Sequence, residues 1–106
     1  MTRYVLNSPV LTDYGLWRFE GPLASAAARD WARGGFESAI GHATTAALLS
    51  ELLGRPVPVE RRRVQLAPGD EALVFRLLER LPEGAVLEPG ALATQRWELG
   101  LLRRVE

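Results

Sequence analysis

The fold of this chain is decided by one stretch, Gly34-Gly35-Phe36-Glu37-Ser38-Ala39-Ile40-Gly41-His42-Ala43-Thr44-Thr45-Ala46, which holds its only histidine. The pattern predicts a short apolar strand over 36–40, a break at Gly41, and a helix over 43–53. His42 would then lie between a strand end and a helix N-terminus, where unpaired N–H groups and the helix dipole favour an anion. An imidazole there could move protons near neutral pH. A lone histidine at such a turn is more often a helix-entry or packing residue, so position alone leaves both roles open.

The length and charge of the chain narrow its class. Its 106 residues predict a single domain over 1–106 with one hydrophobic core. Thirteen arginines balance 13 acidic side chains, and this zero net charge argues against indiscriminate binding of duplex nucleic acid. The absence of cysteine excludes a disulfide framework and a thiolate nucleophile. No apolar run approaches the roughly 20 residues of a membrane span, so we expect a cytoplasmic protein with no membrane partner.

Apolar alternation, punctuated by Gly and Pro, predicts a single α/β domain. We expect a mixed β-sheet of about five or six strands flanked by two or three helices. Strands are predicted over 3–6, 16–20, 36–40, 61–66, 72–78 and 97–102. The run 72–78 is also compatible with a helix, because good helix formers flank it.

Three helices are predicted around this sheet. The first opens at Pro22, ends at Gly34-Gly35 and turns Leu23, Ala27 and Trp31 inward. The second, 43–53, is ended by Gly54 and stacks Ala46, Leu49 and Leu53 on one face. The third is short, over 88–94.

Arginines cluster at Arg61-Arg62-Arg63 and at Arg76 with Arg80. A guanidinium presents a planar fork of donors that fits phosphate oxygens, so several of them near His42 would recognise a compact, multiply phosphorylated ligand. The alternative is that these arginines are solvated or paired with nearby carboxylates, with about 0–1 kcal/mol from each pair. Metal-ligand spacings are absent from the sequence, and we expect neither a metal nor a cofactor.

Four stretches agree in order and spacing with one known family: Tyr4-Val5-Leu6-Asn7-Ser8-Pro9-Val10-Leu11, Gly35-Phe36-x-Ser38-Ala39-Ile40-Gly41-His42-x-x-Thr45-Ala46, Pro68-Gly69-Asp70 and Arg80-Leu81-Pro82-Glu83-Gly84. The chain resembles the small viral anti-CRISPR ring nucleases that act on type III CRISPR systems, together with their cellular and prophage relatives. The resemblance covers nearly the whole chain, and its most specific piece is the motif that runs from Ser38 to Thr45.

The resemblance implies a metal-independent, cofactor-free phosphodiesterase that cleaves cyclic tetra-adenylate, the second messenger of type III CRISPR immunity. The products would be linear di-adenylates with 2′,3′-cyclic phosphate ends. The family works as a homodimer that holds the cyclic ligand across the dimer interface. For a viral member, the site of action is the cytoplasm of the host cell.

The resemblance also implies site residues. It matches the family's catalytic groups to His42, Arg80 and Glu83. Substrate binding is assigned to Asn7, Ser8, Gly41, Thr45 and Arg61. The run Arg61-Arg62-Arg63 departs from the usual pattern of a single arginine, so the question of which one faces the ligand stays open.

General chemistry agrees with this reaction. RNA carries its own nucleophile in the 2′-OH, so the cleavage needs no metal-bound water, and His42 is suited to protonate the leaving 5′-oxygen. Arg61 and Arg80 would stabilise the charge of the transition state. Two alternatives stay open: a non-catalytic nucleotide- or nucleic-acid-binding regulator, and a structural dimerisation module.

Overall fold

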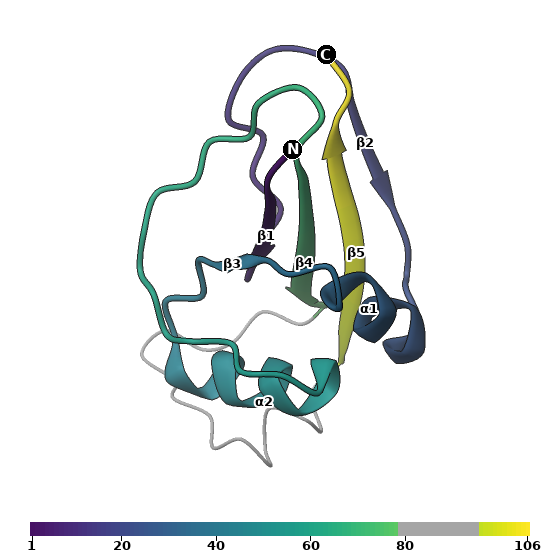
Figure 1. Ribbon diagram of the computed structural model, residues 1–106. Coiled ribbons are helices and arrows are strands. Elements are labelled where there is room, and N and C mark those ends of the chain that lie inside the picture. Colours follow the sequence, from purple (N-terminus) through teal and green to yellow (C-terminus); the bar gives the residue numbers. More distant parts are fainter. Residues whose placement is uncertain (79–95) are drawn as a thin grey trace.

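The computed structural model describes residues 1–78 and 96–106 (Figure 1). Its elements are β1 Arg3–Leu6, β2 Trp17–Glu20, α1 Ser25–Ala32, β3 Glu37–Ser38, α2 Ala43–Leu53, β4 Glu71–Leu77 and β5 Trp97–Arg104. These form one mixed five-stranded sheet with two helices, which confirms the predicted α/β class. The short helix predicted over 88–94 lies outside the described residues.

The sheet has the strand order β2-β5-β4-β1-β3. β1 pairs in parallel with β4 on one side and with β3 on the other, so Val5 lies opposite both Leu73 and Ser38. β5 runs antiparallel to β4 and to β2. Because β4, β1 and β3 are parallel, their carboxyl ends meet at one edge of the sheet. β4 is the central strand and is buried from Glu71 to Phe75, so the strand interpretation of this apolar run is confirmed over the helical one.

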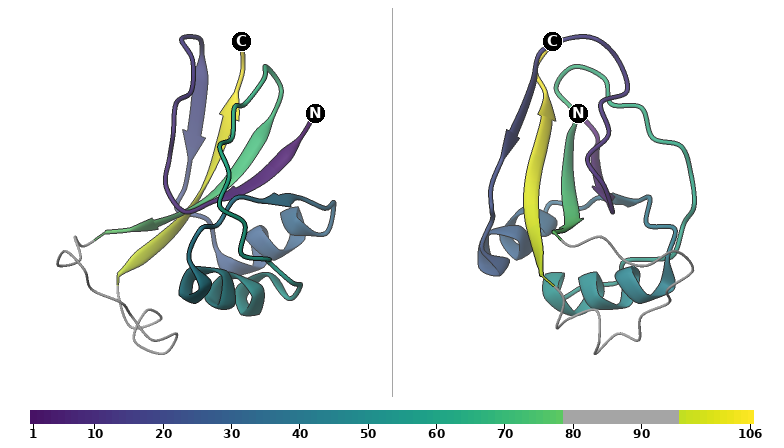
Figure 2. Two further views of the ribbon diagram at one scale, coloured as in Figure 1. Left: turned by 90° about the vertical axis from the view of Figure 1, so that its left-hand side faces the viewer. Right: turned by 180° about the vertical axis from the view of Figure 1, so that it is seen from behind.

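Side chains of the sheet alternate between two apolar layers. One layer includes Val5, Leu73, Phe75 and Leu99, and packs against Ala28 of α1 and Leu49 of α2. Figure 2 shows both helices on one side of the sheet. The other layer contains Leu6, Ala72, Val74 and Leu102 and packs against Trp17 of β2; Val64 and Leu66 cover it in place of a helix.

Helix α2 has the predicted bounds, Ala43–Leu53, because its apolar positions repeat at helical spacing. Ala46, Leu49 and Leu53 are all buried, as the pattern predicted. Gly54 ends the helix in the left-handed conformation, with a φ of 69°, and its N–H donates to the carbonyl of Ser50. A residue without a side chain adopts this conformation most easily.

Helix α1 corrects one prediction. It begins at Ser25 rather than at Pro22, and it buries Ala28 and Ala32 while Ala27 is exposed. The reason is that the N–H of Leu23 donates to the carbonyl of Leu99 at 2.7 Å, which binds this residue to β5 before the helix can start.

Two predicted strands also differ. β3 is only Glu37–Ser38, followed by a single bridge between Ile40 and Val59. The predicted strand over 61–66 is wrong, because this extended segment covers the face of the sheet and has no strand partner. Its alternation still holds over its last three residues, since Val64 is half-buried and Leu66 is buried while Gln65 between them is exposed.

Glu71 is a buried carboxylate at the start of β4. It accepts hydrogen bonds from Nε of Arg103 at 2.9 Å, from Nη2 of Arg103 and from Nε1 of Trp31 at 3.4 Å. Nε of Arg3 lies 3.4 Å from its other oxygen. Burial by itself would raise the pKa of Glu71, but these hydrogen bonds and the charges of Arg103 and Arg3 lower that pKa below its ordinary value of 4.5.

We expect Glu71→Gln to lower the free energy of unfolding by roughly 1–3 kcal/mol at pH 7, because the buried charged hydrogen bonds are lost. A carboxylate whose folded pKa is lowered stabilises fully above its unfolded pKa and loses this effect as the pH falls through the folded value. The difference between wild type and variant should therefore shrink as the pH falls below about 4.5. Urea unfolding at several pH values measures it, and a constant difference would contradict this account.

Candidate functional site

His42 lies at the junction that the sequence predicted. It is the N-cap of α2, with an extended backbone (φ −126°, ψ 126°), and its carbonyl accepts the N–H of Ala46 at 3.0 Å. Its imidazole is exposed and makes no capping hydrogen bond with the helix. The backbone of His42 therefore begins helix α2, while its imidazole is exposed and takes no part in capping the helix.

Arg61 lies directly beside this junction. Its Nη2 donates to the carbonyl of Gly41 at 3.3 Å. A Cβ added to Gly41 would lie 3.2 Å from Nε of Arg61, so the missing side chain makes room for the arginine. The single bridge between Ile40 and Val59 brings the two chain segments together. The guanidinium of Arg61 is thus hydrogen-bonded to Gly41, the residue before His42, although the two residues are 20 positions apart in the chain.

A hollow of about 560 Å³ lies on the face of the sheet that the helices leave open. Its lining includes Arg63, but neither His42 nor Arg61 is part of it. Leu6 and Ala39, both part of the apolar layer on this face, contribute to its lining. One wall comes from the connection between β1 and β2 and the other from the segment after Arg61: Asn7, Ser8, Val10 and Thr12 face Arg62, Arg63, Val64, Gln65 and Leu66.

The three consecutive arginines have different environments. Arg62 is held by Glu37 at 3.6 Å and Glu60 at 3.9 Å, and its guanidinium lies 5.8 Å from the centre of the Tyr4 ring. Within residues 1–78 and 96–106, neither Arg61 nor Arg63 has a carboxylate within ion-pair distance. Arg62 is therefore committed to protein groups, whereas the exposed guanidinium groups of Arg61 and Arg63 form no ion pair in the described part of the chain.

The remaining predicted site residues are placed as follows. Asn7 is half-buried and Ser8 exposed, and both line the hollow. Thr45 is buried in the first turn of α2 and is 9% exposed. Arg80 and Glu83 lie outside the described residues. The structure therefore brings Asn7 and Ser8 together with Arg63.

Two polar groups of the hollow, Thr12 and Gln65, were not predicted as site residues, whereas Arg63 was one of the three arginines among which the ligand-facing one was left open. The outward alternation of Arg63 and Gln65 was a usable signal, but nothing in the sequence paired them with Thr12. Among the described residues, no group of three His, Cys, Asp or Glu side chains is placed to hold a metal ion. Neither helix in this part of the chain has the length and apolarity that crossing a bilayer requires.

Comparison with known proteins supplies the family. The model of the STIV B116-like proteins matches residues 3–99. The chain belongs to the STIV B116-like family. It is 44% identical over 72 residues to ORF117 of Acidianus two-tailed virus, a match that spans 67% of this chain and 62% of ORF117.

Relatives of this STIV B116-like protein also occur outside viruses. YddF of Bacillus subtilis (strain 168) is 32% identical over 104 residues, with 95% of each chain covered. The solved structure of B116 of Sulfolobus turreted icosahedral virus superposes with a TM-score of 0.75 and covers 98% of this chain and all of that one. At 20% identity, this likeness establishes the common fold. These relatives come from two viruses and from a bacterium.

Because Arg62 is paired and Arg63 is not, replacing them should have different effects on the free energy of unfolding. Arg62→Ala should lower the free energy of unfolding by about 1 kcal/mol, because it removes two ion pairs and the contact with the Tyr4 ring. Arg63→Ala should change it by less than about 0.5 kcal/mol, as expected for an exposed side chain without such contacts. Urea unfolding of the two variants measures the difference, and an equal loss in both would show that Arg62 is not committed to protein groups.

Proposed function

We propose that this STIV B116-like protein is a metal-independent ring nuclease that cleaves cyclic tetra-adenylate and so switches off type III CRISPR signalling. The observation that carries the proposal is the exposed imidazole of His42 at the N-terminus of α2, with the guanidinium of Arg61 held on the preceding residue. The resemblance to the viral ring nucleases supplies the substrate, and the relatedness to viral proteins agrees with it.

The first requirement is a place for the phosphates. The first N–H groups of α2 and the dipole of this 11-residue helix favour an anion beside His42. Arg61 and Arg63 add positive charge that no carboxylate among the described residues neutralises. Asn7 and Ser8 offer neutral hydrogen-bonding groups in the hollow that Arg63 also lines. A compact, multiply charged ligand fits this arrangement better than a long duplex, since the net charge of the chain is zero.

The second requirement is a proton for the leaving group. In the proposed step, a ribose 2′-oxygen forms a bond to the adjacent phosphorus while the bond from phosphorus to the 5′-oxygen breaks. The 2′-OH loses its proton to solvent, and protonated His42 gives one to the 5′-oxygen. Arg61 stabilises the charge that develops on the phosphoryl oxygens. Arg80 and Glu83 take the catalytic roles that the resemblance implies.

The proposal includes a homodimer. A twofold dimer presents two copies of His42, and a cyclic tetranucleotide contains a twofold axis. Cleavage at two opposite phosphates then gives two linear di-adenylates with 2′,3′-cyclic phosphate ends.

His42→Ala tests the proposal. Incubated with cyclic tetra-adenylate and excess chelator, the wild type should release di-adenylates, as seen by chromatography. The variant should cleave roughly 10²–10⁴-fold more slowly, because a positioned general acid is lost. Its affinity for the ligand should stay close to that of the wild type.

Three outcomes would contradict this proposal. If the wild type leaves the ligand intact but binds it, the protein is a nucleotide-binding regulator. If His42→Ala no longer binds cyclic tetra-adenylate, His42 is needed for ligand binding or for folding. Salt-dependent retention on nucleic acid without turnover would favour a nucleic-acid-binding regulator.

Arg61 provides a second test. Arg61→Ala should lower the rate of cleavage by roughly 10²-fold, and Arg61→Lys should restore little of it, because an ammonium cannot reproduce the planar fork. Arg33→Ala is the matched control, since Arg33 is exposed on the far end of α1 and pairs only with Asp30 in the described structure. Equal rates in the Arg61 and Arg33 variants would remove Arg61 from the site.

A further inference from the structure

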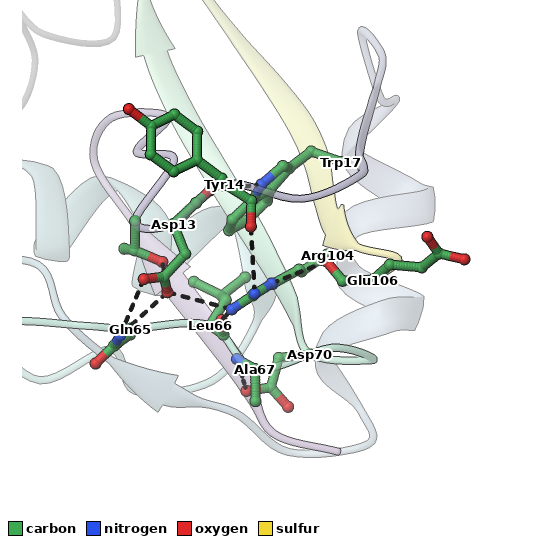
Figure 3. Close-up of polar contacts among 10 residues, drawn as sticks. Asp13, Tyr14, Trp17, Gln65, Leu66, Ala67, Asp70, Arg104 and Glu106 are labelled. Atoms are coloured by element: carbon green, nitrogen blue, oxygen red, sulfur yellow. Dashed lines mark hydrogen bonds and ion pairs between the residues drawn. The ribbon is translucent and has the colours of Figure 1, made fainter.

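One carboxylate connects the two walls of the hollow. Asp13 accepts hydrogen bonds from Nε2 of Gln65 at 3.0 and 3.3 Å, and the hydroxyl of Thr12 lies 3.3 Å from its Oδ2. Thr12 belongs to one wall and Gln65 to the other. Figure 3 shows Gln65 and Arg104 both directed at this carboxylate. Asp13 does not itself line the hollow, and its side chain is 35% exposed.

Arg104, the last residue of β5, supports the contact between Asp13 and Gln65. Its Nη1 donates to Oδ2 of Asp13 at 3.2 Å and to the carbonyl of Leu66 at 2.7 Å (Figure 3). Its guanidinium packs on Trp17, 5.7 Å from the ring centre, and its side chain is only 16% exposed. The indole N–H of Trp17 in turn donates to the carbonyl of Asp13 at 3.1 Å. The contact between Asp13 and Gln65 is therefore supported by a half-buried arginine.

The wall that carries Arg63 needs such a support. The segment over 61–66 belongs to no strand, so no ladder of backbone hydrogen bonds fixes it. Val64 and Leu66 attach it to the sheet through apolar contacts, which have no preferred direction. Polar contacts of Arg61 and Arg62 hold the start of this segment. Among the described residues, hydrogen bonds to Gln65 and Leu66 hold its end beside the Thr12-Asp13 turn.

We propose that Asp13 is a positioning residue that sets the distance between the two walls of the hollow and thereby places Arg63 opposite Asn7. Its consequence for catalysis rests on the proposed ring-nuclease function. Asp13 acts through Gln65 and Arg104 and touches no substrate. Loss of its carboxylate should therefore weaken substrate binding while leaving the chemistry at His42 intact.

The first test needs no ligand. The chain contains one Asn and two Gln, so the side-chain amide region of its ¹H–¹⁵N spectrum is simple to assign. Asp13→Ala should move the resonances of Gln65 and also of Asn7, which lies across the hollow and forms no hydrogen bond with Asp13 in the part of the chain that the structure describes. Asp30→Ala removes a carboxylate from α1, away from the hollow, and should leave both unchanged.

The second test uses cyclic tetra-adenylate. Asp13→Ala should raise KM roughly tenfold, as expected for the loss of hydrogen bonds to a charged group, while kcat changes less than about twofold. Gln65→Ala breaks only the cross-wall bond and leaves the Arg104 anchor, so it should raise KM in the same direction even if Asp13→Ala fails to fold. Asp13→Glu, which keeps the charge, should recover part of the loss.

The outcomes separate this proposal from the proposed function. An Asn7 resonance that stays in place in both the Asp13 and Gln65 variants overturns the positioning role, whatever the activity. Shifted resonances with unchanged KM make Asp13 a stabilising residue only, and also overturn it. If the wild type neither binds nor cleaves the ligand, the ring-nuclease function fails, while a shifted Asn7 resonance still supports the role of Asp13 in shaping the hollow.

Discussion

Parallel pairing on both sides of β1 is the constraint on which the rest of the structure depends. Because β1 is paired with β4 and β3 in the same direction, three chain segments leave the sheet at one edge. Asn7 follows β1, and Gly41 and His42 follow the β3 edge through Ile40. The turn from β3 to α2 also places the N-terminus of α2 at this edge. The polar residue after β1 and the positive end of the helix dipole therefore lie at the same edge of the sheet.

The two faces of the sheet have different coverings, and this difference creates the hollow. Helices α1 and α2 cover one face with a continuous apolar layer. The opposite face is covered by the β1–β2 connection and by the extended segment that ends at Leu66, which meet incompletely. An extended segment offers side chains on alternate sides, so Val64 and Leu66 pack on the sheet while Arg63 remains available at the hollow.

Neighbouring arginines at the end of β5 stabilise opposite faces of the sheet. Arg103 bonds to buried Glu71, and Arg104 bonds to Asp13. Successive residues of a strand point to opposite sides, so one dipeptide serves both layers. The net charge of the chain is zero, but its charged side chains are unevenly paired. Several acidic groups are used to hold the framework, while Arg61 and Arg63 have no carboxylate partner among the described residues.

The sequence by itself determined the α/β class, the bounds of α2, the burial of β4 and the place of His42 at a helix start. These follow from local periodicity and from Gly54, which act over a few residues. Only the tertiary structure decided that 61–66 covers a face instead of joining the sheet, that Arg62 is paired while Arg63 is open, and that Asp13 reaches Gln65 and Arg104. Such partners lie 52 and 91 residues away from Asp13 in the chain, and no local pattern encodes a contact that depends on how the whole sheet is assembled.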